Sequence, residues 1–194
     1  GDLAYQNYYI LSPLLTLIFF IKLYKSKDEK PFKNIAYTFL GIIYVALPFT
    51  LLTVLAYIKN DTYDSNIVLG CLFLLWASDS GAYFAGTKFG KTKLFERVSP
   101  KKSWEGSIGG MITAMVVATI ISRYFTNYSA FQWYAIGVII VVAGTYGDLI
   151  ESLFKRSIEI KDSGSVLPGH GGFMDRFDGL LLSAPFITAF LKIF

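Results

Sequence analysis

The sequence predicts an all-α, polytopic integral membrane protein with about six transmembrane helices. Of its 194 residues, 54% are apolar and only 16% are Asp, Glu, Lys or Arg, whereas typical soluble domains have ~45–50% and ~25%. Six stretches also approach the ~20 mostly apolar residues that a helix needs to cross ~30 Å of hydrocarbon. No alternating strand pattern appears, and lipid cannot satisfy the open backbone groups of irregular chain, so helix is the expected structure.

The expected spans follow one another along the whole chain. They lie at about 8–24, 35–58, 67–87, 106–125, 131–151 and 179–194. Three of them contain a proline (Pro13, Pro48, Pro185), which membrane helices tolerate better than soluble helices do. We therefore expect a single transmembrane domain over residues 1–194. Because the chain opens on Gly1 rather than on Met, we expect it to be a fragment or a processed chain.

Composition also excludes several classes of protein. Cys71 is the single cysteine, so no disulfide can form within the chain and a disulfide scaffold is excluded. The net charge of +4 looks basic, but the positive residues are confined to a few stretches. No nucleic-acid partner is therefore expected, and the lipid bilayer is the expected environment.

The basic residues predict the orientation of the spans. Fifteen of the 18 Lys and Arg residues lie in loops near 22–34, 88–105 and 152–178. By the positive-inside rule these loops face the cytoplasm. The absence of cysteine pairs and the short loops favour a multi-pass protein of a bacterial inner (cytoplasmic) membrane. In the 22–34 loop the charges need only anchor topology and attract anionic lipid head groups. The other two loops mix their charges with Gly, Pro, Ser and acids, which indicates a site.

Two acids lie where lipid is expected. Asp79 falls in the middle of the third span and Asp148 at the cytoplasmic end of the fifth. A carboxylate at membrane depth is costly and marks function by default, although a hydrogen bond between helices is the alternative. Asp148, Glu151, Ser152 and Lys155 have the spacing i, i+3, i+4, i+7 and so share one helical face. Such a face cannot point to lipid and predicts the wall of a polar cavity.

The segment 152–179 carries the chemistry. It is polar and glycine-rich and holds the only histidine, His170. Its basic side chains are suited to phosphate. They are Lys155, Arg156, Lys161 and Arg176.

Acidic residues of the same region suit a metal ion. Asp175 and Asp178 are three residues apart, so both can face one metal ion if the chain turns into the sixth helix, and Asp148 can join them. All-carboxylate ligands suit Mg²⁺, which binds substrate phosphates alongside one or two carboxylates. Acids for a hard cation and bases for phosphates, both on the cytoplasmic side, point to phosphoryl or nucleotidyl transfer on a lipid.

These residues resemble a known family. The run S-x-x-K-R at 152–156, K-D at 161–162, G-H-G-G at 169–172 and D-R-x-D at 175–178 resembles the signature of phosphatidate cytidylyltransferases (CDP-diacylglycerol synthases). A second block resembles the same family, namely Asp79 together with SPKKSWEG at 99–106. The resemblance implies transfer of a cytidylyl group from CTP to phosphatidic acid, giving CDP-diacylglycerol and pyrophosphate for phospholipid biosynthesis. It also implies Mg²⁺, with a second cation allowed beside the first, and often a homodimer. Members of the family carry further membrane spans upstream, so the resemblance implies that this sequence is the C-terminal part of a longer chain.

The resemblance also implies residue roles. Asp148 and Asp175 look like metal ligands, and Asp178 supports their cluster. Groups expected to hold the triphosphate or the lipid phosphate are Ser152, Lys155, Arg156, Lys161 and Arg176. His170 is expected to donate a hydrogen bond or organise the loop rather than to act as a base.

Three residues of the 88–105 loop are expected in the cytidine or phosphate pocket, and Asp79 is expected to shape the cavity for the lipid head group. The three are Lys101, Lys102 and Glu105. Their alternative interpretation is a helix cap at Ser103 with lysines that extend to the membrane interface.

Two other functions compete with this interpretation. A CTP-dependent polyprenol or lipid kinase also needs basic loops and a cation, but it would release CDP rather than pyrophosphate. An ion-coupled transporter could use Asp79 and Asp148, but no inverted repeat supports it.

Overall fold

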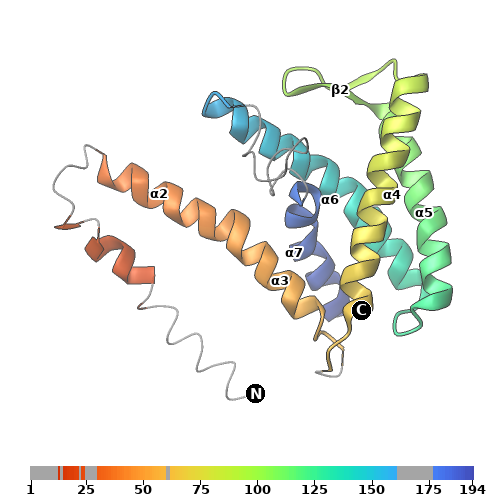
Figure 1. Cartoon of the computed structure of the whole chain (residues 1–194), viewed down its shortest axis with the longest axis horizontal. Coiled ribbons are helices and arrows are strands. Elements are labelled where there is room, and N and C mark those ends of the chain that lie inside the picture. The colour runs from red at the N-terminus through yellow and green to blue at the C-terminus, as the bar shows by residue number, and fades with distance from the viewer. Residues whose placement is uncertain (1–12, 14, 22, 25–29, 60–61, 161–176) are drawn as a thin grey trace, which may run out of the picture. The chain divides into compact units, whose positions relative to one another are not determined.

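Helices form most of the chain, as its composition predicts (Figure 1). The computed structural model describes residues 13, 15–21, 23–24, 30–59, 62–160 and 177–194. The chain divides into two compact units, residues 1–46 and 47–194, and each is described by itself. The first contains α2 (Pro31–Gly41), which starts on a proline at its first position, and the π-helical turn η1 (Ile42–Ala46). Proline suits the start of a helix because its missing N–H would have no partner there.

The second unit carries the candidate site. Its elements are α3 (Leu47–Leu55), α4 (Ser65–Phe89), β1 (Lys93–Phe95), β2 (Ser99–Ser103), α5 (Trp104–Tyr124), α6 (Ala130–Ser157) and α7 (Asp178–Ile193). Side chains cap the long helices: Asp64 accepts the Asn66 N–H at 2.9 Å, and Ser103 accepts the Gly106 N–H at 3.1 Å. Such caps satisfy backbone donors that the helix leaves open, which is why these helices begin where they do.

Four helical stretches of the described chain are long and apolar enough to cross a membrane. They are Pro31–Leu55, Ser65–Phe89, Trp104–Tyr124 and Ala130–Ser157. They match four of the expected spans, and the protein is all-α and membrane-like. The number of about six is not confirmed, because seven of the 17 residues of the expected span 8–24 fall outside the described residues and α7 has only 16 residues. The single-domain prediction stays a prediction.

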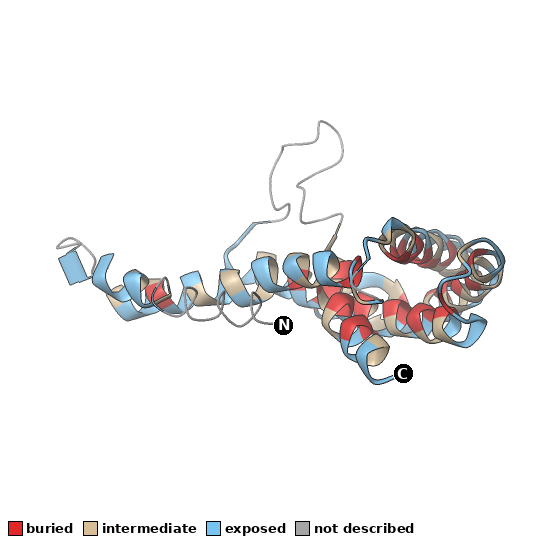
Figure 2. Ribbon diagram, turned by 90° about the horizontal axis from the view of Figure 1, so that it is seen from below, coloured by how far each residue is buried: buried red, intermediate tan, exposed pale blue. Residues whose placement is uncertain are grey.

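The core of the second unit lies where α3 to α7 face one another (Figure 2). Its largest member is Trp133, which is fully buried and donates its indole N–H to the Phe125 carbonyl at 3.1 Å. Around it pack apolar side chains with almost no exposure, including Leu55, Ile67, Leu74, Ile136, Leu180 and Ile187. This core fixes α3 to α7 against one another in one arrangement.

Helices α4 and α5 approach closely because a glycine stands at their contact. A Cβ atom added at Gly81 would lie 2.0 Å from the Thr113 hydroxyl and 2.8 Å from the Gly109 carbonyl oxygen. Backbone cannot retreat as a flexible side chain can, so any larger residue would push the helices apart. Because the two helices are so close, the Thr113 hydroxyl of α5 can donate a hydrogen bond to the Ala77 carbonyl of α4 at 2.9 Å.

We expect Gly81→Ala to lower the free energy of unfolding by about 1–3 kcal/mol, the usual cost of overpacking. Thermal unfolding of the purified protein in detergent measures this. Gly41→Ala is the matched control, because nothing lies within 4 Å of a Cβ atom there and a helical Gly→Ala change alone is neutral or stabilising. Equal stability of the two variants would show that the α4–α5 contact does not need Gly81.

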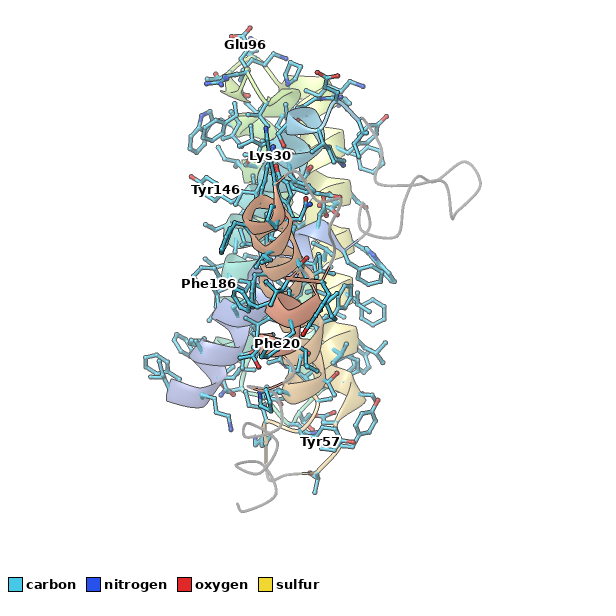
Figure 3. All side chains as sticks on the ribbon, turned by 90° about the vertical axis from the view of Figure 1, so that its left-hand side faces the viewer. Phe20, Lys30, Tyr57, Glu96, Tyr146 and Phe186 are labelled. Atoms are coloured by element: carbon cyan, nitrogen blue, oxygen red, sulfur yellow. The ribbon has the colours of Figure 1, made fainter. Side chains whose placement is uncertain are left out.

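One element was not predicted. Within the expected 88–105 loop, β1 and β2 form an antiparallel hairpin in which Lys93 pairs with Ser103 and Phe95 with Ser99. The hairpin and the end of α6 lie at one end of the second unit, and the end of α3 and the 125–129 connection lie at the other (Figure 1). Figure 3 likewise separates Glu96 of the hairpin from Tyr57. The basic residues of the hairpin and of the end of α6 therefore share one end, as the charge pattern predicts.

Candidate active site

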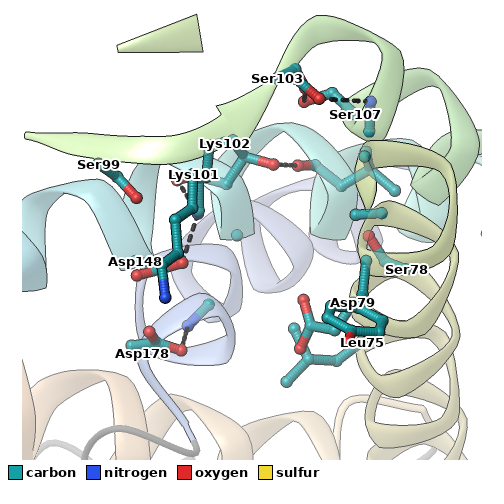
Figure 4. A pocket seen from close by; sticks show the side chains of 18 of the residues that line it. Leu75, Ser78, Asp79, Ser99, Lys101, Lys102, Ser103, Ser107, Asp148 and Asp178 are labelled. Carbon is teal, nitrogen blue, oxygen red and sulfur yellow. Dashed lines mark hydrogen bonds and ion pairs between the residues drawn. The ribbon is translucent and has the colours of Figure 1, made fainter. Parts of the chain in front are cut away.

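A polar cavity of about 450 Å³ lies at the hairpin end of the second unit (Figure 4). Its walls come from α4, β2, the start of α5, the second half of α6 and the start of α7. Among the described residues, three carboxylates and three lysines line it. They are Asp79, Asp148, Asp178, Lys101, Lys102 and Lys155. All six were predicted site residues, and the fold brings them together from segments up to about a hundred positions apart.

The shortest contact in the cavity joins the hairpin to α6. Lys102 Nζ lies 2.5 Å from Asp148 Oδ2 and also donates to the Thr145 carbonyl oxygen at 3.3 Å. The side chains of Lys102 and Asp148 are 25% and 38% exposed, so the pair is partly open to the cavity. A partly desolvated pair of this kind attracts more strongly than a surface pair. Lys102 therefore neutralises Asp148 in this structure.

The other two carboxylates lie within electrostatic reach of Asp148. Asp178 stands at the first position of α7, where its Oδ1 accepts the Gly179 N–H at 2.6 Å. Asp148 repels the charges of both Asp178 and Asp79, and Lys102 attracts that of Asp79. Figure 4 shows Asp148 and Asp178 close to Lys102, with Asp79 projecting from α4 into the same cavity. Concentrated negative charge of this kind favours a bound cation.

The predicted polar face of α6 is confirmed by its contacts. Ser152 Oγ donates to Asp148 Oδ1 at 3.3 Å, and Lys155 Nζ lies 3.5 Å from Glu151 Oε2. Glu151 is only 1% exposed and Lys155 is 14% exposed. Lys155 lines the cavity, whereas its partner Glu151 is buried in the protein interior.

Residues of the 99–106 block have two different roles, one structural and one in the cavity. Ser103 caps α5, as the alternative interpretation expects, and Lys101 and Lys102 nevertheless line the cavity. Glu105 is not among the lining residues. Its carboxylate accepts the backbone N–H groups of Lys91 at 3.2 Å and Thr92 at 3.1 Å, so in this structure it fastens the start of the hairpin. Its predicted contact with substrate stays a prediction.

We expect Glu105→Ala to loosen the hairpin without unfolding the bundle. The carboxylate of Glu105 is a charged acceptor for both N–H groups, and such bonds are stronger than neutral ones, so without it the Lys91 and Thr92 amides should exchange hydrogen for deuterium faster. Mass spectrometry of the exchanged peptides measures this. Glu96→Ala, at an exposed carboxylate of the same hairpin, should leave these rates unchanged. Unchanged rates in Glu105→Ala would assign the hairpin's order to other contacts.

Several predicted residues lie elsewhere or outside the described residues. Arg156 is exposed near the end of α6, donates to the Ile160 carbonyl at 3.5 Å and does not line the cavity. Lys161, His170, Asp175 and Arg176 fall in 161–176, outside the described residues. Their roles, including the sharing of a metal ion by Asp148 and Asp175, stay predictions.

Sequence reasoning missed several contributors to the cavity, of which two make its polar wall clearest. Ser78 lines it at only 7% exposure, and the Thr145 backbone carbonyl receives Lys102. Ser78 could have been found as the neighbour of Asp79. The Thr145 carbonyl could not have been found, because every residue has the same backbone carbonyl group. Only the tertiary structure shows which one meets Lys102.

The donor set fits a hard divalent cation. The part of the chain that the structure describes contains no group of three or more His, Cys, Asp or Glu side chains arranged to hold a metal ion. Mg²⁺ needs fewer, since it usually keeps several waters and takes one or two carboxylates with substrate phosphates. Asp148 and Asp178 supply two carboxylates to one cavity beside lysines suited to phosphate.

Comparison with known proteins finds one family along almost the whole chain. The model of the cytidylyltransferase family matches residues 3–194. Phosphatidate cytidylyltransferase of Haemophilus influenzae is 41% identical over 91% of this chain, that of Bacillus subtilis 37% over 87%, and that of Staphylococcus aureus strain COL 33% over 93%. The chain spans 63%, 62% and 69% of these relatives' lengths, in that order.

Proposed function

The chain belongs to the cytidylyltransferase family, and on that premise we propose that it carries the active site of a phosphatidate cytidylyltransferase. The reaction transfers the cytidylyl group of CTP to phosphatidic acid and yields CDP-diacylglycerol and pyrophosphate. The observation that supports this most directly is the cavity in which three lysines and three carboxylates meet. Two polyanionic substrates need both signs of charge, because lysines attract phosphates while carboxylates hold the cation that screens them.

In the proposed reaction the substrates supply the reacting atoms. An oxygen of the phosphatidic acid phosphate forms a bond to the α-phosphorus of CTP, the bond from that phosphorus to the bridging oxygen of the β-phosphate breaks, and pyrophosphate leaves with those electrons. The attacking phosphate is largely ionised near neutral pH, so neither a protein nucleophile nor a strong base is required. The work of the protein is positioning and charge stabilisation.

The residues of the cavity divide that work. Lys101, Lys102 and Lys155 attract and orient the phosphates of the two substrates. Asp148 and Asp178 are the described residues that would hold Mg²⁺, together with Asp175 in the prediction from sequence. Bound there, Mg²⁺ would neutralise the charge that develops between the attacking and leaving oxygens. Substrate phosphate arriving at Lys102 competes with Asp148 for its charge, which would free that carboxylate for the cation.

The proposal includes the setting of the site. Six spans, with 8–24 and 179–194 beside the four long helices, would put the hairpin and the end of α6 on the cytoplasmic face of a bacterial inner membrane. The head group of phosphatidic acid lies at that face, and CTP reaches it from the cytoplasm. A second bound cation and a homodimer stay predictions from the family resemblance.

The test uses the purified full-length protein with Mg²⁺, CTP labelled in the cytidine, and phosphatidic acid in mixed micelles. We expect labelled CDP-lipid and one pyrophosphate for each CTP consumed. Release of CDP with a newly phosphorylated lipid would instead identify a CTP-dependent lipid kinase. Absence of CTP turnover, combined with ion-driven uptake into vesicles, would identify a transporter.

A further inference from the structure

A second, apolar groove adjoins the polar cavity. It has a volume of about 420 Å³ and lies between the start of α5 and the second half of α6, with Leu94 of the hairpin at one end. Side chains of the two helices form its walls and floor. They are Trp104, Ile108, Met111, Ile112, Val141, Val142 and Tyr146, with Ser107 and Thr145 between them. The hairpin closes this end through the contact of Phe95 with Tyr146, whose ring centroids lie 6.4 Å apart.

The two polar residues of the groove do not make it polar. Ser107 already donates its hydroxyl to the Ser103 carbonyl at 3.3 Å, and Thr145 donates to the Val141 carbonyl at 2.6 Å. Their remaining surface is largely carbon, so the groove offers an apolar ligand a continuous apolar lining. Ile108, Ile112 and Val142 are 59%, 61% and 48% exposed, so the groove is open along its side.

The groove and the polar cavity share a wall. Ser107, Val141 and Thr145 line both, and the carbonyl of Thr145 receives Lys102 from the cavity side. From Trp104 to Ile112 the groove follows α5 for about 12 Å at 1.5 Å per residue, away from the hairpin and toward the middle of a candidate membrane span. A molecule with a phosphate at Lys102 and a long apolar chain would meet both environments at once.

We propose that this groove binds an acyl chain of the substrate lipid and thereby sets which phosphatidic acids the site accepts. The inference rests on the proposed function. The phosphate would occupy the polar cavity, while one fatty acyl chain would run between α5 and α6 from the shared wall into the bilayer. Contacts with the acyl chain, remote from the reacting atoms, would then help to hold the lipid phosphate close to CTP.

The test fills the groove from its exposed rim. In the full-length protein, Val142→Trp should raise KM for dioleoyl phosphatidic acid about tenfold, the usual penalty for losing a methylene or two of pocket contact, and change KM for the dihexanoyl lipid less than twofold. Val138→Trp is the matched control, since Val138 lies one turn earlier on the same face of α6, is 43% exposed and does not line the groove. Ile108→Trp repeats the test from α5, with Val116→Trp as its control.

A second readout does not depend on turnover. Phosphatidic acid with a photoreactive group on its acyl chain should label peptides containing 104–112 or 141–146, and Val142→Trp should reduce that labelling at least about threefold. Equal KM changes for long and short chains, or labelling that an excess of dioleoyl phosphatidylcholine removes as well as phosphatidic acid does, would overturn the groove proposal. Lack of CDP-lipid from the unaltered protein with either lipid would instead reject the proposed function, and the labelling would still decide the groove.

Discussion

Asp148→Asn should abolish most cytidylyl transfer while the protein stays folded. The change keeps the size of the side chain and an oxygen able to accept the Ser152 hydroxyl, which lies 3.3 Å from Asp148 Oδ1. It removes the negative charge at the centre of the cavity, and with it the main described ligand proposed for Mg²⁺. Losing about 4 kcal/mol of stabilisation by a metal ion corresponds to roughly a thousandfold lower kcat/KM.

Two measurements separate a metal-binding role from a structural one. The Mg²⁺ concentration for half-maximal residual activity should rise at least about tenfold, and the temperature of thermal unfolding should stay within a few degrees of that of the unaltered protein. Glu96→Gln makes the same chemical change at an exposed carboxylate of the hairpin and should leave activity and Mg²⁺ dependence as they are. Normal activity in Asp148→Asn would remove the metal assignment from this residue.

Lys102→Met should lower kcat/KM for CTP by about a hundredfold, within the range found for the loss of one preorganised group that stabilises charge in a transition state. Lys102 joins the hairpin to α6 inside the cavity, with contacts to Asp148 at 2.5 Å and to the Thr145 carbonyl at 3.3 Å. Methionine keeps most of the apolar stem and removes the ammonium group. The loss should appear mainly in KM for CTP if Lys102 holds phosphate in the ground state, and mainly in kcat if it acts in the transition state.

Two further variants test whether the charge of Lys102, rather than the shape of its side chain, causes the loss of activity. Lys102→Arg keeps the charge and should recover at least part of the lost activity, although Arg and Lys differ in geometry. Lys93→Met removes an exposed lysine from β1 of the same hairpin and should have little effect. A loss in Lys93→Met as large as that in Lys102→Met would show that the general positive charge of the hairpin, and not the ion pair with Asp148, is what matters.

The helices were predictable because their cause is local. Runs such as 67–87 and 106–125 are apolar enough to require a helix in lipid, and the structure has Ser65–Phe89 and Trp104–Tyr124 there. The polar face of α6 was predictable for the same reason, since side chains three and four positions apart on a helix must lie together. The hairpin was not, because its short strands carry no alternating pattern and are held by contacts from other elements, such as Glu105 on the amides of Lys91 and Thr92.

By itself the sequence determined that this protein is a bundle of membrane helices and which of its ends carries positive charge, and it predicted a set of acids and bases for the site, six of which line one cavity. Those properties depend on composition and on spacing within single helices. Only the tertiary structure decided that Lys102 meets Asp148, that Asp79 and Asp178 face the same cavity, and that an apolar groove lies beside it. Contacts between distant segments depend on how helices pack, and that is set by details such as the missing side chain of Gly81, whose consequence appears only when two helices meet.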